Sequence, residues 1–538
     1  MKTGGSVEGI ALDRAPVAPI LNAADAVLGP PLLRGLGGAP ALRWRDRELT
    51  YEQLRQAVNR AGHALRHQGV TPGARVLLLL ADAPALVVAY LGALKVGAVP
   101  VTMHVRSTSS ELLFAIRESE CVLAVVDAAN LPRYETIAPL LEAPPRVIAA
   151  GDAAGGAGPF EDWIAGYPPE LQAERRRPAD MAFWIYTSGS TGRPKAAVHA
   201  QRDVLGGGRY LRDVLGVRAG DRLFATSKLF FAYALGTCLF GALRLGATTV
   251  LCDEPASAAA VHDVLARHAP NVVFSVPGTY RELMRHGDPT AEPFRRVRHY
   301  VSAGEKLTPA LLADWQARTG RPIVEGYGTT ETLHMALTNR PGAIRPGCAG
   351  QVAPGAEVLL KDAQERTVTT PGEAGILWVR MASLCERYWN RPLRSEAVFR
   401  GPWFVTGDVF TCDAQGWFTH LGRDDDALKL GGQWMDLPEL EALLLAVPGV
   451  ADVAALGVPA PEGGETLGLV IVPEHRGTHR RLARRIRGVF AETRPVPGGP
   501  QLRWADELPR TASGKLQRYR LRRRWLERAA SAPQADEL

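Results

Sequence analysis

The first half of the chain alternates short apolar runs with stretches whose apolar residues recur at helical spacing. The runs are rich in Val, Leu and Ile, and turn formers or a helical pattern follow each of them within a few residues. This alternation is typical of an α/β fold with buried strands. The pattern predicts strands at Val76 to Leu80, Val122 to Val126, Val147 to Ala150, Thr248 to Leu251 and Val272 to Val276.

The most hydrophobic stretch runs from Val76 to Val101. Asp82, Pro84 and Lys95 interrupt it, so it is too broken for a membrane span. We interpret it as a strand followed by a buried helix. A soluble protein without a membrane partner is expected.

The pattern changes near Gly347, where short strands separated by Gly, Pro and Asp turns begin. These strands predict a smaller β-rich subdomain, and a separate α+β domain follows it. A chain of 538 residues is too long for one ordinary hydrophobic core, so two or more domains are expected. The change of pattern along the chain predicts domains at 1–424 and 425–538. Examples of these predicted short strands are Glu357 to Lys361, Gly375 to Arg380 and Trp417 to Leu421. The last domain is expected to hold a helix at Pro438 to Leu445, strands at Val450 to Leu456 and Leu467 to Val472, a basic helix and an Arg-rich helix.

The composition is that of an ordinary globular protein, with 46% hydrophobic and 22% charged residues. The six cysteines lie far apart and form neither a CxxC pair nor a metal-binding spacing with histidine. A disulfide framework is not expected, and a reducing cytoplasm fits. The N-terminus lacks the apolar core of a signal peptide, so no export is predicted.

The net charge of +7 comes mostly from arginine, which gathers in two clusters near the C-terminus. A cluster of this kind is typical of a solvated helix face. It could also attract a polyanion such as ATP or CoA, and a nucleic-acid patch would look similar but with more interleaved aromatic residues. The clusters are Arg480, Arg481, Arg484, Arg485 and Arg487, and then Arg518, Arg520, Arg522, Arg523, Arg524 and Arg528.

The strongest chemical signal is the segment from Tyr186 to Lys195, which reads Tyr-Thr-Ser-Gly-Ser-Thr-Gly-Arg-Pro-Lys. Its hydroxyls, glycines and backbone N–H groups can surround phosphate oxygens, and Lys195 adds a positive charge. It is not a Walker A loop, because that pattern needs Gly-Lys-Ser/Thr. Plain flexible turns can have the same composition.

A second segment, Glu325 to Thr332, combines an aromatic residue, threonines and an acid. Tyr327 could stack on a base, Thr330 could bind a phosphate oxygen, and Glu331 could hold Mg²⁺. Two further segments contain Asp408 with Arg423, and Lys515. A carboxylate suits ribose hydroxyls, while Arg and Lys suit phosphate or carboxylate oxygens.

These four segments, in this order, resemble the adenylate-forming superfamily of acyl- and aryl-CoA ligases, peptide synthetase adenylation domains and firefly luciferase. A narrower resemblance, to the benzoate-CoA ligase branch, rests on Ser227 to Gly236, Val301 to Glu305, Thr332 to Met335 and Asn339 to Gly342. It implies an α/β fold with two doubly wound subdomains and a β-rich one in a large N-terminal adenylation core. A small mobile α+β lid domain would follow.

The resemblance also implies an activity and the roles of single residues. The enzyme would activate an aromatic acid with ATP as acyl-AMP, release pyrophosphate and pass the acyl group to coenzyme A. Lys515 would bridge the acid and the α-phosphate, Thr330 would touch that phosphate, and Glu331 would bind Mg²⁺. Asp425 would be the hinge of the lid, and Gly431 and Gly432 would line the CoA tunnel.

The implied ATP and AMP site includes Thr187, Ser188, Gly189, Ser190, Thr191, Gly192, Lys195, Ser302, Ala303, Gly304, Glu305, Gly326, Tyr327, Gly328, Thr329, Asp408 and Arg423. The implied acyl site includes Phe231, Ala232, Tyr233, Gly304, Gly328, His334 and Met335. The glycines and Ala232 would leave a flat slot for a ring. His334 is either an ordinary core histidine or a polar contact for an ortho substituent, so benzoate, 2-aminobenzoate and hydroxybenzoates are candidates.

The sequence departs from the family pattern at two places. Ala196 and Ala197 follow Lys195, where a glycine is usual, and Met435, Asp436 and Leu437 replace the usual Val, Ser and Pro of the segment that lines the thiol tunnel. The second departure leaves the acceptor open between CoA, which we favour, and an acyl carrier protein. A nucleotide- or nucleic-acid-binding protein without ligase activity is the alternative of a different class.

Overall fold

The structure is a computed structural model that describes residues 19–150, 160–188, 194–424, 428–430, 433–435, 437–460, 465–475, 477–493, 499–510 and 516–531. The chain divides into two compact units. The first contains Met1–Thr187, Lys195–Val358 and Val379–Phe404. The second contains Ser188–Pro194, Leu359–Trp378 and Val405–Leu538. The predicted boundary between residues 424 and 425 stays a prediction.

A seven-stranded sheet has the order β18-β8-β7-β4-β3-β5-β6. The neighbouring strands from β7 through β6 in this order are parallel, and β18 is antiparallel to β8. Its central strands β3 and β4 are almost completely buried, because helices cover both faces. The strands are β3 Arg75–Leu79, β4 Val99–Thr102, β5 Leu123–Asp127, β6 Arg146–Ala150, β7 Met181–Ser188, β8 Pro194–Ala200 and β18 Arg387–Tyr388.

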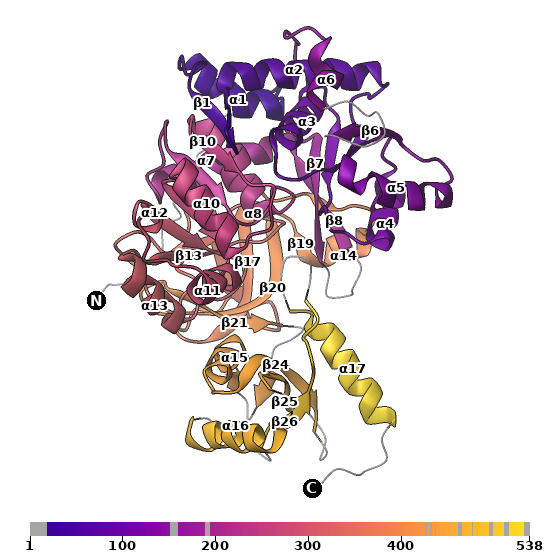
Figure 1. Cartoon of the computed structure of the whole chain (residues 1–538). Helices are drawn as coiled ribbons and strands as arrows, with labels where there is room; N and C mark the ends of the chain where they lie inside the picture. The colour runs from indigo at the N-terminus through magenta and orange to yellow at the C-terminus, as the bar shows by residue number, and fades with distance from the viewer. Residues whose placement is uncertain are drawn as a thin grey trace, which may run out of the picture. The chain divides into compact units, whose positions relative to one another are not determined.

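A nine-stranded sheet has the order β15-β14-β13-β12-β11-β9-β10-β1-β2, with parallel pairs from β13 through β1 and antiparallel edges (Figure 1). All five strands predicted from the first half lie within one residue of their observed bounds. The strands are β1 Pro40–Trp44, β2 Arg47–Thr50, β9 Arg222–Ala225, β10 Thr248–Leu251, β11 Val272–Ser275, β12 His299–Ser302, β13 Ile323–Tyr327, β14 Leu337–Thr338 and β15 Gln351–Val352.

Helices connect the parallel strands, and several begin at sequence-encoded caps. Thr50 forms a capping box with Gln53 at the start of α2, and Thr108 forms one with Glu111 at the start of α4. The α-helices are α1 Ala23–Leu33, α2 Tyr51–His67, α3 Pro84–Lys95, α4 Ser109–Ser119, α5 Leu131–Ile137, α6 Phe160–Ala165, α7 Gly207–Asp213, α8 Ala232–Ala234, α9 Leu243–Leu245, α10 Ala258–His268, α11 Pro277–His286, α12 Glu292–Arg295, α13 Pro309–Thr319 and α14 Pro392–Val398. Shorter 3₁₀ turns are η1 Ala128–Asn130, η2 Ala138–Leu140 and η3 Gln201–Gly206, and η4 Leu235–Ala242 is a π-helix.

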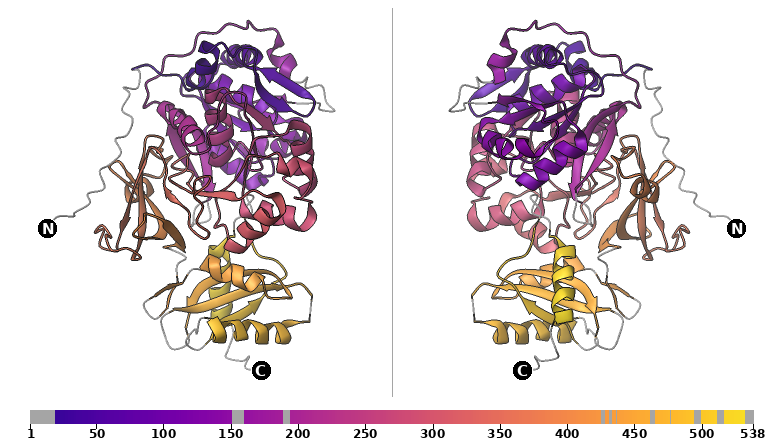
Figure 2. Two further views of the ribbon diagram at one scale, coloured as in Figure 1. Left: turned by 90° about the vertical axis from the view of Figure 1, so that its left-hand side faces the viewer. Right: turned by 90° about the vertical axis from the view of Figure 1, so that its right-hand side faces the viewer.

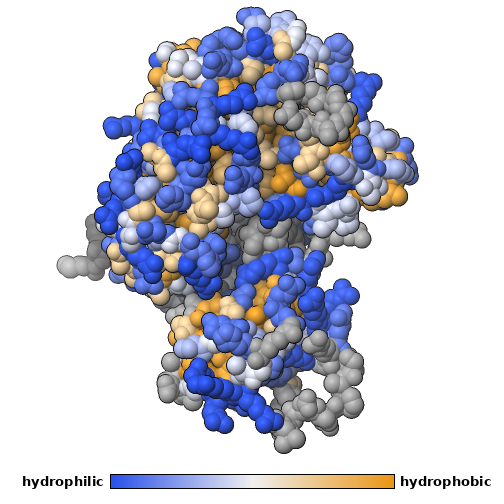
Figure 3. Space-filling model, in the orientation of Figure 1, coloured by the Kyte–Doolittle hydropathy of each residue, from blue (hydrophilic) through white to orange (hydrophobic). Residues whose placement is uncertain are grey.

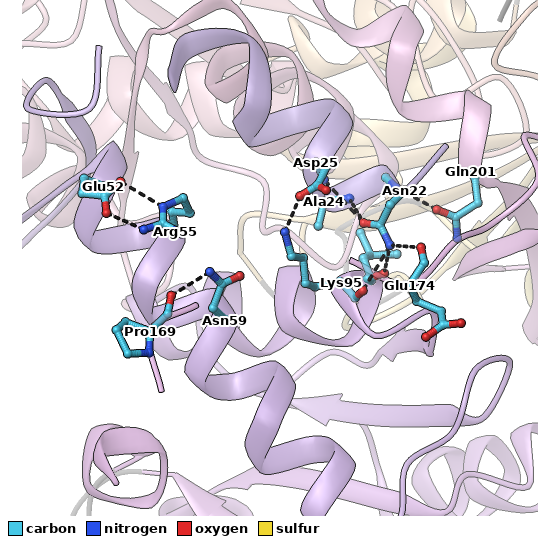
Figure 4. A network of polar contacts seen from close by, with 12 residues as sticks. Asn22, Ala24, Asp25, Glu52, Arg55, Asn59, Lys95, Pro169, Glu174 and Gln201 are labelled. Atoms are coloured by element: carbon cyan, nitrogen blue, oxygen red, sulfur yellow. Dashed lines mark hydrogen bonds and ion pairs between the residues drawn. The ribbon is translucent and has the colours of Figure 1, made fainter. Parts of the chain in front are cut away.

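A buried polar network ties the first helix to the rest of its unit (Figure 4). Asn22 caps α1 by accepting from the Ala24 backbone N–H, and its amide donates to the carbonyl of Leu94 at 2.9 Å. Lys95 pairs with Asp25 at 2.5 Å. Because the Asn22 amide and the Asp25 carboxylate both bond to the C-terminal end of α3, the network fixes α1 against α3.

A five-stranded sheet has the order β16-β17-β20-β19, with β21 paired to β20. It matches the predicted β-rich region, although β20 extends over ten residues and was not predicted as a strand. The strands are β16 Ala356–Lys361, β17 Ala374–Met381, β19 Phe399–Arg400, β20 Trp403–Cys412 and β21 Phe418–Arg423.

The C-terminal part contains the sheet β24-β25-β26 and the helices α15, α16 and α17 (Figure 2). Leu444, Leu469, Ile471, Ile486 and Phe490 belong to its own buried core. The elements are β22 Leu428–Leu430, β23 Gln433–Met435, α15 Leu437–Leu445, β24 Val450–Pro459, β25 Glu465–Pro473, α16 His479–Thr493, β26 Gln501–Trp504 and α17 Arg518–Ser531. The predicted α/β fold class and the α+β character of this part are confirmed.

The surface of α16 is hydrophilic in the view of Figure 3, as its exposed arginines predict. Within the described ranges, no helix combines the length and apolarity needed to cross a membrane.

Candidate active site

Several predicted site residues of the first unit lie where parallel strands end. Ser302 is the last residue of β12, and Gly326 and Tyr327 close β13. Thr226, which was not predicted as a site residue, follows β9. The Thr226 hydroxyl pairs with the Ser275 hydroxyl at 2.7 Å across the ends of β9 and β11. Ligands of open α/β sheets bind at the carboxyl ends of the strands, so this edge is the expected place for a site.

The turn that follows β13 is held by three successive backbone carbonyls. His199 contacts the Thr330 carbonyl at 3.0 Å, the Cys385 N–H donates to that of Glu331 at 2.8 Å, and the Ser383 hydroxyl donates to that of Thr332 at 2.8 Å. The turn is also strained, because Leu333 has a φ of +62° that side chains rarely adopt. Strain of this kind persists where the surroundings enforce it, and it concentrates at functional sites.

The carboxylate of Glu331 is buried and oriented by a tyrosine. The Tyr388 hydroxyl donates to its Oε1 at 2.5 Å, and the Lys195 ammonium lies 4.2 Å from the centre of the Tyr388 ring. Burial, followed by the charge of Glu331, raises the pKa of Tyr388 far above its usual 10.0. Tyr388 is therefore a permanent donor to this carboxylate.

Glu331 is also the candidate Mg²⁺ ligand, and its surroundings fit that role. Within the described residues, no three carboxylate, imidazole or thiol groups come together as a metal cage. Mg²⁺ usually binds through one or two carboxylates and completes its shell with water and substrate phosphates. A single carboxylate of fixed orientation can serve such a site.

The side chain of His334 lies between two glycines of neighbouring segments. A Cβ added to Gly236 would lie 2.9 Å from its Nδ1, and one added to Gly206 would lie 3.4 Å from its Nε2. Burial lowers the pKa of His334 from 6.5 to about 3, and Nε2 has no hydrogen-bond partner among the described residues. Because a buried polar atom without a partner is costly, the neutral imidazole is suited to contact a ligand.

The predicted slot glycines make room for backbone as well. A Cβ at Gly328 would meet the His334 carbonyl at 2.6 Å. Gly326, which was predicted for the nucleotide site and not for the slot, is equally tight, because a Cβ there would meet Met335 Sδ at 3.0 Å. Gly304 has a φ of +87°, which favours glycine whatever the space. These contacts explain the glycines by packing and conformation, and their role beside a ring stays a prediction.

The predicted acyl residues Phe231 to Tyr233 lead into the π-helix η4. Tyr233 packs edge-on against Phe274, and its buried hydroxyl has no partner among the described residues. The Thr237 hydroxyl donates to the Tyr233 carbonyl at 2.6 Å. π-helical turns are rare and frequently lie at functional sites.

The start of this segment is anchored by a buried carboxyl group, that of Asp82, and a half-buried ammonium group, that of Lys228. Both oxygens of Asp82 accept from the Leu229 N–H at 3.1 Å, and Lys228 donates to the carbonyls of Cys252 and Glu254 at 2.5 and 2.6 Å. Burial raises the pKa of Asp82 to about 7. The Phe231 segment is thus held from two sides before the aromatic residues begin.

The predicted adenine loop begins at Ser302, whose buried hydroxyl has no partner among the described residues. Ala303 is buried, and Glu305 pairs with Arg281 at 3.4 Å. Glu325 accepts from the Leu307 N–H at 2.9 Å, and burial raises its pKa to about 8. Tyr327 pairs with Leu337 of β14 and is half-buried.

Asp408 belongs to the second unit, on β20 directly opposite Arg423 of β21. Arg423 contacts one carboxylate oxygen at 3.2 Å and His420 contacts the other at 3.1 Å. Arg423 also donates to the Thr406 carbonyl at 2.8 Å. Each carboxylate oxygen has two acceptor sites, so this held Asp408 could also accept from ribose hydroxyls.

The remaining predicted residues can be placed only in part. Thr187 lies near the end of β7 and Thr329 donates its backbone N–H to Thr332. Eight residues that the resemblance assigns lie outside the described residues. They are Gly189, Ser190, Thr191, Gly192, Asp425, Gly431, Gly432 and Lys515.

The sequence reasoning missed the residues that support this site. They are His199, Asp203, Ser383, Tyr388 and His420. None of them stands inside a predicted motif. His199 was detectable in principle, because it lies on a buried strand only four residues after Lys195, the last residue of the phosphate loop.

Two family models match the chain. The model of the AMP-binding enzyme family matches residues 33–389, which is more than half of the chain, and the model of its C-terminal domain matches residues 439–515. The chain belongs to the AMP-binding enzyme family. Within the family, similar proteins place it in the benzoate-CoA ligase-like branch.

Three similar proteins cover almost the whole chain. A 3-hydroxybenzoate–CoA/4-hydroxybenzoate–CoA ligase of Thauera aromatica is 42% identical over 93% of this chain and 97% of its own length. A benzoate–CoA ligase of the same organism is 36% identical over 93% of this chain and 95% of its own length. The solved anthranilate CoA ligase AuaEII with anthranoyl-AMP has a TM-score of 0.86 and 32% identity, over 96% of this chain and 99% of its own.

Proposed function

We propose that this chain is an AMP-forming aryl-CoA ligase, which activates an aromatic carboxylic acid with ATP and transfers the acyl group to coenzyme A. The observation that carries the proposal is the full-length likeness to ligases whose names all contain an aromatic acid and CoA. The benzoate, 2-aminobenzoate and hydroxybenzoate candidates all remain within this class. Because the 42% identical relative is named for hydroxybenzoates, we favour a hydroxybenzoate.

The first half-reaction joins two anions, the acid and the α-phosphate of ATP, so the protein must position them and neutralise charge. We assign Lys515 to the bridge between them, Thr330 to the α-phosphate and the Thr187–Lys195 loop to the β- and γ-phosphates. Mg²⁺, held by Glu331, would neutralise phosphoryl charge. The carboxylate attacks the α-phosphorus, and pyrophosphate leaves.

The rest of the nucleotide is assigned to three of the sequence motifs. We assign the adenine to Tyr327 and the loop Ser302–Glu305, and the ribose to Asp408. The orientation of Asp408 by Arg423 and His420 supports the last assignment.

The second half-reaction is the attack of the CoA thiol on the acyl-AMP, which releases AMP. We propose that a lid of residues 425–538 rotates about Asp425 between the two steps. Gly431 and Gly432 would then permit close approach of the pantetheine arm, because they have no side chain. The scattered cysteines are the basis for proposing that the enzyme works in the cytoplasm.

An acyl carrier protein is the alternative acceptor, because Asp436 and Leu437 depart from the usual tunnel sequence. The likeness to proteins named as CoA ligases favours CoA. CoA-dependent release of a soluble thioester would support the ligase, and labelling of a holo-carrier without CoA turnover would support the alternative.

The experiment that tests the proposal is an ATP–pyrophosphate exchange screen over benzoate, 2-aminobenzoate and the three hydroxybenzoates, with acetate and a long-chain fatty acid as comparisons. We expect exchange that depends on an aromatic acid, and aryl-CoA on addition of CoA. Exchange that is absent for all aromatic acids would refute the proposed function.

A further inference from the structure

His199 contacts a polar partner through each ring nitrogen, deep inside the first unit. Its Nδ1 lies 2.9 Å from Oδ2 of Asp203, and its Nε2 lies 3.0 Å from the carbonyl oxygen of Thr330. Both side chains are completely buried, with 0% exposure. The ring of Phe183 stacks on the imidazole at 4.9 Å with an interplanar angle of 8°.

The two partners determine how many protons the pair must hold. An amide carbonyl such as that of Thr330 can only accept, so Nε2 of His199 must carry a proton. At the other nitrogen, a neutral imidazole and an ionised carboxylate would face each other as two acceptors 2.9 Å apart. A second proton must therefore lie between Nδ1 and Oδ2, whichever of the two atoms holds it.

The surroundings of the pair favour this arrangement. The Ala200 N–H also donates to Oδ2 of Asp203 at 2.9 Å, while Arg202 approaches the other oxygen at 3.9 Å. With two protons the pair is neutral as a whole, which reduces the cost of burying an imidazole and a carboxylate. The neighbouring His334 is neutral, because burial lowers its pKa to about 3.

We propose that His199 and Asp203 form a proton-sharing pair that positions the Thr330 carbonyl, and with it the turn that carries Thr330 and Glu331. The pair connects β8, which follows the phosphate loop, to the turn after β13. Both are positioning residues, since neither is placed against a substrate. The kinetic part of this inference rests on the proposed function, whereas the proton count does not.

The proton count is tested by nitrogen-15 NMR of the full chain with labelled histidine at pH 7. The chain has 12 histidines, and the His199 signals are those that disappear in His199→Gln. We expect protons on Nε2 and in the Nδ1–Oδ2 bond, and a single ring proton in the isosteric variant Asp203→Asn. The inference is overturned if the wild-type signals show that the His199 imidazole carries one proton and shares none with Asp203.

The positioning role is tested by two variants that each keep one half of the contact. The amide nitrogen of His199→Gln can take the place of Nε2 and donate to Thr330, whereas that of His199→Asn can take the place of Nδ1 and donate to Asp203 alone. We expect kcat for acid-dependent pyrophosphate exchange to be at least about tenfold lower in His199→Asn than in His199→Gln, which corresponds to about 1.4 kcal/mol. The KM for ATP and the thermal midpoint should be similar in the two variants.

Other results separate the inference from the proposed function. Equal kcat in the two variants, or losses that follow the thermal midpoint, would reduce the pair to a structural element and overturn the positioning role. If either variant does not fold, Asp203→Asn replaces it. A kcat of Asp203→Asn within twofold of the wild-type kcat would then also overturn the positioning role. Wild-type enzyme without any acid-dependent exchange would instead refute the proposed function and leave the NMR result to decide the proton count.

Discussion

The hydroxyl of Tyr388 donates a hydrogen bond of 2.5 Å to the carboxylate of Glu331, 57 residues away in the sequence. Both side chains are buried, and the Lys195 ammonium lies over the tyrosine ring. The carboxylate that we assign to Mg²⁺ is thus oriented by a residue of β18, and that strand pairs with β8, which carries Lys195. Tyr388 thus contacts both motifs to which we assign the phosphates and the metal.

Tyr388→Phe should weaken metal binding without removing the metal ligand. The variant loses a hydrogen bond to a charged group, which contributes about 1.5 to 3 kcal/mol. We expect the Mg²⁺ concentration that gives half-maximal pyrophosphate exchange to rise by about tenfold. Titration of Mg²⁺ at saturating ATP and acid measures this shift.

The matched control is Tyr90→Phe, which removes another buried phenol. The Tyr90 hydroxyl has no hydrogen-bond partner among the described residues, so its loss should leave the Mg²⁺ requirement unchanged. A Tyr388→Phe enzyme with the wild-type Mg²⁺ requirement would contradict the role of Tyr388.

Much of the fold could be predicted from the sequence because it depends on local pattern. Buried parallel strands read as continuous Val and Leu runs, and the five strands predicted in the first half are all present. The strand β20 escaped prediction, since Gly407 and Asp408 interrupt its apolar pattern. The π-helix η4 escaped as well, because no residue pattern distinguishes its hydrogen bonding from that of an α-helix.

The site could be predicted only where it consists of contiguous motifs. Glu331 and Thr330 belong to a recognisable segment, whereas Ser383 and Tyr388 reach the same turn from one distant segment and His199 reaches it from another. Their contacts are made by tertiary packing between distant segments, and such contacts produce no recognisable spacing of residues in the sequence. Sequence reasoning therefore found the residues assigned to ligands and missed those that orient them.

Lys515→Ala should separate the two half-reactions. Removal of a group that stabilises developing charge commonly costs about two to three orders of magnitude, so acyl-AMP formation should fall by that factor. Thioester formation from chemically made acyl-AMP should persist, and single-turnover assays of each step measure the difference. Lys361→Ala, which removes a lysine of β16, is the control, and equal loss in both steps would contradict the assignment of Lys515.

Asp82→Asn should remove part of the pH dependence of stability. Burial raises the pKa of Asp82 from 3.8 to about 7, so the folded state binds this proton more tightly than the unfolded state. The free energy of unfolding therefore falls as the pH rises from about 4 to about 7, by about 4 kcal/mol at most, given about 1.4 kcal/mol per pKa unit. The variant has no such proton, so it should lose less stability over this range.

Urea unfolding of both proteins between pH 5 and pH 8 measures this difference. Glu325 and Asp127 also have raised pKa values, of about 8 and about 6, but both proteins share them and their effects cancel in the comparison. If the two pH profiles run parallel, Asp82 does not titrate in this range.

His334 should decide between substituted and unsubstituted aromatic acids. Its imidazole is neutral, and its buried Nε2 has no partner among the described residues, so a hydroxyl or amino group on the ring could satisfy it. His334→Ala should reduce kcat/KM about tenfold more for an ortho-substituted benzoate or a hydroxybenzoate than for benzoate, because a hydrogen bond lost from a buried site costs about 1 to 3 kcal/mol. Met335→Leu, which preserves volume at the next residue, should reduce kcat/KM for all aromatic acids by the same factor.

In the wild type, kcat/KM for benzoate-sized acids should exceed that for acetate and fatty acids by about a hundredfold, since several buried contacts separate them. Equal losses on benzoate and its derivatives would remove the role of His334, whereas a fatty acid used as efficiently as benzoate would refute the aromatic substrate.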